Sequence, residues 1–167
     1  MRLPKIRNFI KVKTLSKNNI KNYNQQLLID SREPVTIIKK IIDNCGNLID
    51  IRRLKTGDYV SDDMEVAVER KTMKDFAASL ISEKKRLWTQ FDRLKKEFKH
   101  PYIVIGGRIS DLESEVSAHA ILGAVAFLAS HGVTVVQIDN NKDLVYLILK
   151  IFENHGKLRM INELQDI

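Results

Sequence analysis

A β-hairpin between residues 58 and 71 constrains the fold of this chain more than any other segment. The run Met64–Arg70 alternates in period two and is rich in β-branched residues, a pattern that predicts a half-buried strand. A two-residue turn at Asp62-Asp63 would connect it to a strand over Asp58–Ser61. With the turn at this position, antiparallel pairing sets Tyr59 opposite Val66.

The same pairing places three charged side chains on one face of the hairpin. Glu69 and Lys71 are two residues apart, so both side chains leave the same face of the strand. Asp58, opposite Ala67, shares that face and is a diagonal neighbour of Glu69, at roughly 7–8 Å between Cα atoms. Two such carboxylates can share a divalent cation, and a lysine beside them can contact a water or phosphate oxygen on it. The residues thus indicate a hydrolytic site for phosphodiesters.

Strands and helices alternate along the rest of the chain. Apolar runs bounded by turn residues predict strands at 26–30, 48–54, 102–106 and 133–138. Apolar stripes at helical spacing predict helices at 34–44, 72–82, 83–98, 116–130 and 142–153. Thr72 and Asp75 have the spacing of a capping box at the start of the second helix. Such alternation predicts an α/β fold with a central mixed β-sheet flanked by helices.

The net charge of the chain lies at its N-terminus. Seven of the 28 lysine and arginine residues and none of the 21 acidic residues fall in the first 25 positions, against a net charge of +7. We expect residues 1–24 to form a basic arm or an extra edge strand, and the charge indicates a polyanionic partner. One cysteine, Cys45, and the lack of an apolar run of about 18 residues favour an intracellular protein without a membrane partner, in cytoplasm or nucleoid, or in the nucleus of a eukaryote.

The hairpin residues belong to a longer motif. Gly57-Asp58 is followed by Glu69-Arg70-Lys71 and, three residues later, by Asp75, while Asp30-Ser31-Arg32-Glu33 precedes them. This combination resembles the signature of the XPF/Hef family of structure-specific endonucleases. Arg86–Gln90 resembles a helical segment of that family, and the resemblance covers about residues 26–140.

The resemblance implies a restriction-endonuclease-like core and cleavage of DNA near branch points such as 3′ flaps and forks, as in DNA repair or replication-fork processing. It assigns metal binding to Asp30, Glu33, Asp58 and Glu69. It makes Lys71 the catalytic lysine and adds Arg70, whose carbonyl is a further candidate ligand, with support from Arg32, Asp75 and Gln90. Because the ligands are hard oxygens, the expected cofactor is Mg²⁺ or Mn²⁺.

The resemblance also divides the chain. The nuclease domain is expected over 25–156, and residues 157–167 are expected to form a C-terminal helix or a tail. Family members usually carry a tandem helix-hairpin-helix module that grips duplex DNA, and no Gly-rich hairpin pattern follows residue 140. The sequence is then either an isolated nuclease domain or a minimal member that grips DNA in another way. We expect branched DNA as the partner, and a helix-hairpin-helix module, a helicase or a sliding clamp supplied separately is a candidate second partner.

Basic residues near the motif are candidates for DNA binding. They lie mostly off the apolar stripe of the segment 83–98, where they either form a solvated helix face or contact phosphates: Lys84, Lys85, Arg86 and Arg93. The histidines show no spacing typical of metal ligands, and each is expected at the surface or at a helix end: His100, His119, His131 and His155.

Two late helices are strongly apolar. A small basic domain seldom needs two such helices solely for its own core, so we expect 116–130 and 142–153 to form the interface of a homodimer, with packing inside one chain as the alternative. The expected interface residues are Phe127, Leu128, Leu147 and Phe152.

Two other functions fit the motif less well. A non-catalytic DNA-binding or dimerisation subunit on the same fold is expected to lose acidic ligands, and here all of them remain. A Holliday-junction resolvase or a restriction enzyme shares the Glu-x-Lys core, but not the Glu-Arg-Lys-x-x-x-Asp string or the upstream Asp-x-Arg-Glu. The sequence therefore predicts a metal-dependent DNA endonuclease.

Overall fold

A computed structural model describes residues 26–45, 48–112 and 116–165, so the predicted arm at 1–24 lies outside the described residues. The sheet has six strands in the order β2-β1-β3-β4-β5-β6. Their bounds are β1 Gln26–Asp30, β2 Leu48–Arg52, β3 Tyr59–Ser61, β4 Val66–Thr72, β5 His100–Gly106 and β6 Thr134–Ile138. Because β3 runs antiparallel to β1 and β4 while the other neighbours are parallel, the sheet is mixed, as predicted.

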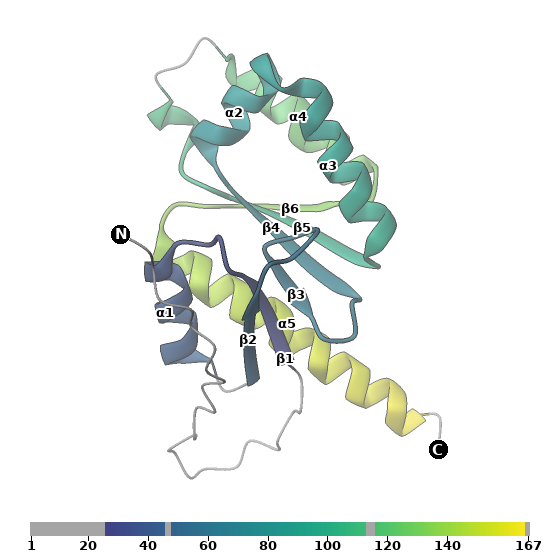
Figure 1. The fold of residues 1–167 in the computed structure, drawn as a ribbon. Helices are drawn as coiled ribbons and strands as arrows, with labels where there is room; N and C mark the ends of the chain where they lie inside the picture. The colour runs from purple at the N-terminus through teal and green to yellow at the C-terminus, as the bar shows by residue number, and fades with distance from the viewer. Residues whose placement is uncertain (1–25, 46–47, 113–115, 166–167) are drawn as a thin grey trace.

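Helices cover both faces of the sheet. They are α1 Val35–Asn44, α2 Met73–Ser82, α3 Lys84–Glu97, α4 Ala118–Ser130 and α5 Asn141–Gln165, with a short 3₁₀ turn at Ile109–Asp111. Figure 1 shows α2, α3 and α4 on one face and α1 and α5 on the other. The predicted α/β architecture is confirmed, and no helix in the described part of the chain is both long and apolar enough to cross a bilayer.

Each face has its own hydrophobic core. The stripe predicted on α3 is buried over the first face, since Leu87, Phe91 and Leu94 are at most 3% exposed. On the second face α5 packs Ile148 and Phe152 against the sheet. The sheet lies between these two layers. Its strand β4 contributes Ala67 to the first core and Val66 and Val68 to the second, so the charged residues at its C-terminal end have a rigid support.

Two of the residues expected at a dimer interface lie inside the chain instead. Leu128 is 2% exposed and Phe152 is 1% exposed, because each points from its helix towards the sheet. Leu147 is partly buried against the second core, whereas Phe127 is 49% exposed. The alternative of packing within one chain holds for Leu128 and Phe152. The two helices also lie on opposite faces of the sheet, so they do not form one continuous surface (Figure 1).

The α5 helix is longer than predicted. It runs without interruption from Asn141 to Gln165 and so crosses the boundary expected at 156–157. The predicted range 142–153 covers the part of α5 that packs Ile148 and Phe152 against the sheet, and the helix continues beyond it.

The predicted register of the hairpin was wrong by two residues. Tyr59 pairs with Val68, not Val66, and Val60 pairs with Ala67. The connection is a loop over 62–65 rather than a two-residue turn, and Met64 takes a left-handed conformation with φ of 60°. A shift of two residues leaves every side chain on its original face, because side chains alternate with period two.

Candidate active site

Three carboxylates form a row across three neighbouring strands. Ile29 pairs with Tyr59 and Tyr59 pairs with Val68. Asp58 directly precedes β3, and its backbone joins the two flanking strands: its carbonyl accepts from the N–H of Asp30 at 2.8 Å, and its N–H donates to the Val68 carbonyl at 2.9 Å. Its carboxylate also accepts from the N–H of Arg70, the residue after Glu69. Asp58 and Glu69 line the same cleft.

The carboxylate pair consists of a half-buried aspartate, Asp58, and a buried glutamate, Glu69. Glu69 is 7% exposed, and the Asp58 carboxylate accepts a hydrogen bond of 2.7 Å from the backbone N–H of Arg70. Burial, together with the negative charge of Glu69, raises the pKa of Asp58 to about 8. Burial also raises the pKa of Glu69, although Lys71 opposes the shift. A cation between these carboxylates would remove that penalty, so the residues fit a divalent metal ion.

Lys71 and Gln90 complete this side of the site. The Lys71 ammonium lies 3.7 Å from Glu69 Oε1, and its side chain is 14% exposed. The Gln90 amide, from α3, donates a hydrogen bond to the same carboxylate oxygen. Gln90 therefore fixes one Glu69 oxygen, and Lys71 places a positive charge at the edge of the carboxylate pair.

The Asp30 carboxylate accepts hydrogen bonds from two segments, the loop that follows β1 and the segment that follows β2. Its side chain is fully buried and accepts hydrogen bonds from the backbone N–H and guanidinium of Arg32, at 2.6–2.9 Å, and from the N–H of Leu54 at 3.1 Å. The hydrogen bonds from Arg32 hold the pKa of Asp30 below its ordinary value. Asp30 therefore stands in the carboxylate row, but both of its oxygens are engaged.

Glu33 accepts hydrogen bonds from Arg70 and Tyr59, whose side chains lie on the face of the sheet opposite to Asp58 and Glu69. Arg70, which alternates with Glu69 and Lys71 along β4, donates to Glu33 from Nε at 2.7 Å and from a terminal nitrogen at 3.2 Å. The hydroxyl of buried Tyr59 donates to the same carboxylate. Burial raises the pKa of Tyr59, which keeps this hydroxyl protonated as a donor. Sequence spacing did not predict this network. Neighbouring strand residues point to opposite faces, so the sequence could have indicated that Tyr59 and Arg70 leave the face opposite to Asp58 and Glu69.

We expect Glu33→Gln to destabilise the fold by about 3 kcal/mol, because it leaves the half-buried Arg70 charge without its counterion. The matched control is Glu83→Gln, which breaks the exposed pair with Arg86 and should cost less than about 1 kcal/mol. Urea unfolding of both variants measures the difference. Equal losses of stability would show that the Glu33–Arg70 pair is not a structural contact.

A cleft of about 930 Å³ opens over the carboxylate pair. All four bases predicted for DNA binding line it, with two more from the loops: Arg32, Lys55, Lys84, Lys85, Arg86 and Arg93. Thr56 also lines the cleft, and its buried hydroxyl has no hydrogen-bond partner among the described residues. Gly57 allows the loop to reach Asp58, since its φ is +78° and an added Cβ would lie 3.3 Å from Ala67 and Val60.

Asp75 stays away from the carboxylate pair. Thr72 caps α2 by accepting from the N–H of Asp75 and by donating to its carboxylate at 2.6 Å, as the capping box predicted. The Asp75 carboxylate is exposed at the first turn of the helix. Of the predicted residues, the structure brings together Asp58, Glu69, Lys71 and Gln90, with Asp30 alongside.

Fold and site together define an α/β domain whose mixed sheet presents a pair of carboxylates and a lysine to a basic cleft. The sequence model of the ERCC4 domain matches residues 29–151, and this chain belongs to the ERCC4 domain family. It is 35% identical over 128 residues to "Putative ATP-dependent RNA helicase MJ1505" of Methanocaldococcus jannaschii, covering 77% of this chain and 15% of that protein. It is 27% identical over 130 residues to "3'-flap repair endonuclease Xpf" of Saccharolobus solfataricus, covering 77% and 54%.

Solved structures share the fold. XPF from Aeropyrum pernix in complex with DNA superposes with a TM-score of 0.69 at 25% identity, covering 79% of this chain and 65% of that chain. XPF from the same organism superposes with a TM-score of 0.67 at 24% identity, covering 84% and 70%. The resemblance to XPF proteins drawn from the motif is confirmed. The chain spans only part of both curated relatives, 15% of one and 54% of the other.

Proposed function

We propose that this chain is the nuclease domain of a structure-specific DNA endonuclease that hydrolyses phosphodiesters near branch points such as 3′ flaps and forks. The observation that carries the proposal is the pair of half-buried Asp58 and buried Glu69 beside Lys71 in a basic cleft. The names of the XPF relatives support the substrate class, because one is a 3′-flap repair endonuclease and another was solved with DNA.

In this proposal Asp58 and Glu69 hold the cation, Mg²⁺ or Mn²⁺, through hard carboxylate oxygens. When bound, such an ion lowers the pKa of water and offsets negative charge on a phosphate. Lys71 places its ammonium where a phosphate oxygen gains charge during hydrolysis. Gln90 keeps the Glu69 carboxylate turned towards the pair.

Asp30 and Glu33 take a supporting role in the proposal. Asp30 orients Arg32 at the cleft, and Glu33 orients Arg70 behind β4. Asp30 would reach the cation only after releasing Arg32 and the N–H of Leu54. The motif led us to expect four metal ligands. The proposal now has two, Asp58 and Glu69, while Asp30 and Glu33 each bind an arginine.

Cleavage of labelled DNA tests the proposal. We expect the chain to cut a 3′ flap and a fork near the branch in Mg²⁺ or Mn²⁺, to leave intact duplex largely uncut, and to lose activity in EDTA. The cleft bases supply phosphate contacts, so binding should weaken as salt rises. Cleavage that persists in EDTA would refute the metal-dependent mechanism.

We also propose a homodimer, now through the exposed residues of α4. Leu122 is 54% exposed and Phe127 is 49% exposed, and Phe127 packs beside Trp88 with ring centroids 4.9 Å apart. These side chains replace Leu128 and Phe152, which the core of the chain already uses.

Leu122→Glu should convert the dimer into a folded monomer. A two-fold interface places the change twice, and burying each unpaired charge costs several kcal/mol. The matched control is Val35→Glu on α1, an apolar residue that is 78% exposed on the other face of the sheet. Sedimentation velocity with far-UV circular dichroism gives the result. A wild-type protein that is monomeric at tens of micromolar would end the dimer hypothesis.

The part of DNA recognition outside this domain is proposed to come from a separate module. The relative from M. jannaschii is named as a helicase, and this chain spans 15% of its length. A helicase or a helix-hairpin-helix module would add duplex affinity to the cleft described above. Adding the separate module to the cleavage reaction should then lower the concentration of DNA required for half-maximal rate.

A further inference from the structure

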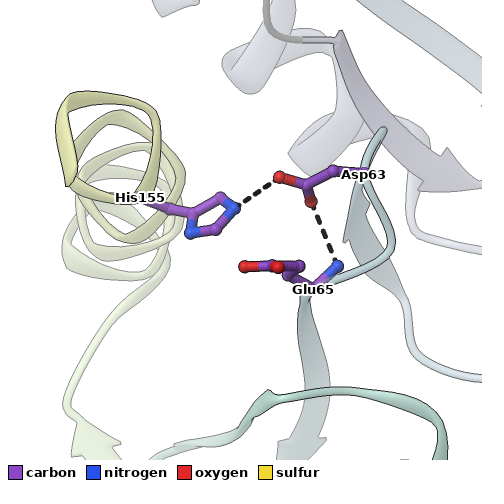
Figure 2. A group of neighbouring side chains, drawn as sticks. All are labelled: Asp63, Glu65 and His155. Atoms are coloured by element: carbon purple, nitrogen blue, oxygen red, sulfur yellow. Dashed lines mark hydrogen bonds and ion pairs between the residues drawn. The ribbon is translucent and has the colours of Figure 1, made fainter. Parts of the chain in front are cut away.

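A second cluster of metal-ligand side chains lies at the other end of β4. Asp63 and Glu65 stand in the β3–β4 loop, and His155 reaches them from α5, about ninety residues later (Figure 2). The ligand atoms of the three side chains all lie within 4.8 Å of one another. Among the described residues, no other group of three or more histidine, cysteine or acidic side chains has its ligand atoms this close together.

His155 contradicts the expectation that each histidine lies at the surface or at a helix end. It is 9% exposed and sits well inside α5. Its Nε2 lies 2.7 Å from Asp63 Oδ2, and Figure 2 shows the Glu65 carboxylate directed towards the same ring. One buried imidazole therefore faces two carboxylates that come from a distant part of the chain.

We propose that Asp63, Glu65 and His155 form a binding site for a transition-metal ion, foremost Zn²⁺, that ties α5 to the β3–β4 loop. An imidazole with two carboxylates is a ligand set that Zn²⁺ accepts, whereas Mg²⁺ and Ca²⁺ take oxygen ligands. Two carboxylates also balance the double charge of the ion. This inference does not depend on the proposed nuclease function.

The geometry of the cluster needs only small adjustments. Bond lengths near 2.0–2.2 Å place ligand atoms on a tetrahedral ion roughly 3.3 Å apart. The Asp63–His155 contact must open by a few tenths of an ångström as the ion enters between the two side chains, and Glu65 must move in from at most 4.8 Å. A water, or His100, whose ring centroid lies 6.1 Å from that of His155, completes the coordination.

The surroundings hold the ligands in place. Asp63 Oδ1 accepts from the Ser61 hydroxyl at 2.5 Å and from the N–H of Glu65 at 3.0 Å, and Asp63 Oδ2 lies 2.7 Å from the imidazole Nε2. Exposed Lys99, whose ammonium lies 3.7 Å from the Glu65 carboxylate, competes with the ion for Glu65.

The cluster is separate from the candidate active site. Glu65 immediately precedes β4, while Glu69 and Lys71 follow four and six residues later, so the two sites are roughly 13–20 Å apart along the strand. An ion at the cluster would therefore fasten α5 against the strand that carries the carboxylate pair. Its effect is on stability, not on the reacting phosphate.

Zinc binding is best measured on the full chain carrying Asp58→Asn and Glu69→Gln, which removes the carboxylate pair as a competing site. We expect one Zn²⁺ per chain by isothermal titration and elemental analysis, and visible absorption typical of tetrahedral Co²⁺ when Co²⁺ replaces it. At about 100 times the dissociation constant, Zn²⁺ should raise the thermal midpoint by roughly 5–10 °C.

Two substitutions and a control locate the ion. Glu65→Gln, at a side chain 44% exposed, should weaken binding at least about tenfold without unfolding the chain. His155→Gln should abolish binding, and His119→Gln, at an exposed position on α4, should change nothing. No saturable Zn²⁺ binding, or binding unchanged by Glu65→Gln, would overturn the proposal even if His155→Gln fails to fold.

Discussion

Asp58→Asn and Glu69→Gln should each reduce cleavage of a 3′ flap in Mg²⁺ by about a thousandfold or more. Each substitution removes one of the two charges proposed to hold the cation. The fold should survive, because the two carboxylates repel each other when no cation is bound and the pKa of Asp58 is already raised to about 8. The metal-free variants should therefore unfold at the same temperature as the parent or higher.

The control for this pair is Asp92→Asn on α3, whose carboxylate is exposed and paired with Lys96. It should leave both activity and thermal midpoint unchanged. Two readouts separate a metal ligand from a structural residue, since loss of a structural carboxylate lowers the midpoint as well as the rate. An Asp58→Asn variant with activity within about threefold of the parent would remove Asp58 from the cation site.

Lys71→Ala should lower the cleavage rate by about two to four orders of magnitude while leaving metal affinity nearly unchanged. An ammonium does not ligate a cation, so its loss removes charge stabilisation at the phosphate rather than a metal bond. Its position 3.7 Å from Glu69, with only 14% of the side chain exposed, makes it part of the site rather than a solvated surface charge.

Lys150→Ala is the matched control for Lys71→Ala. Lys150 is also paired with a glutamate, Glu153, but it lies on α5, on the other face of the sheet. Its loss should not change the rate. A titration of Mg²⁺ against rate distinguishes the roles, because a Lys71→Ala variant that regains its full rate at high Mg²⁺ would show Lys71 to be only an electrostatic support for the metal.

Local patterns predicted the elements of this fold because they record which face of each element is buried. The stripe on α3 and the alternation along β4 both correspond to the two cores. They could not predict the hairpin register, which depends on the loop at 62–65 and on Met64 adopting a positive φ. The face assignment of Asp58 survived the error, since the shift was by two residues.

Long-range partners were beyond the reach of sequence spacing. The motif brought Asp58, Glu69 and Lys71 together correctly because strand geometry alone relates them. It could not show that Arg70 and Tyr59 bind Glu33 from the opposite face, since that contact depends on how β1 and β4 are placed in the sheet.

The sequence also could not show which neighbour the apolar face of a helix packs against. An apolar helix can pack inward or against a second copy, and spacing gives the stripe but not its neighbour. Leu128 and Phe152 proved to face the sheet, whereas Leu122 and Phe127 do not. His155 was missed as a candidate ligand for the same reason, because the loop that carries Asp63 meets α5 only in the folded chain.

The most direct test of the account is to locate the cation itself. Crystals of the protein soaked with Mn²⁺ give an anomalous scattering peak at each bound ion. We predict a peak between the carboxylates of Asp58 and Glu69, close to the Lys71 ammonium, that disappears in the Glu69→Gln variant. Crystals with Mn²⁺ elsewhere, for example only at Asp63, Glu65 and His155, and no peak between Asp58 and Glu69 would contradict the proposed catalytic site.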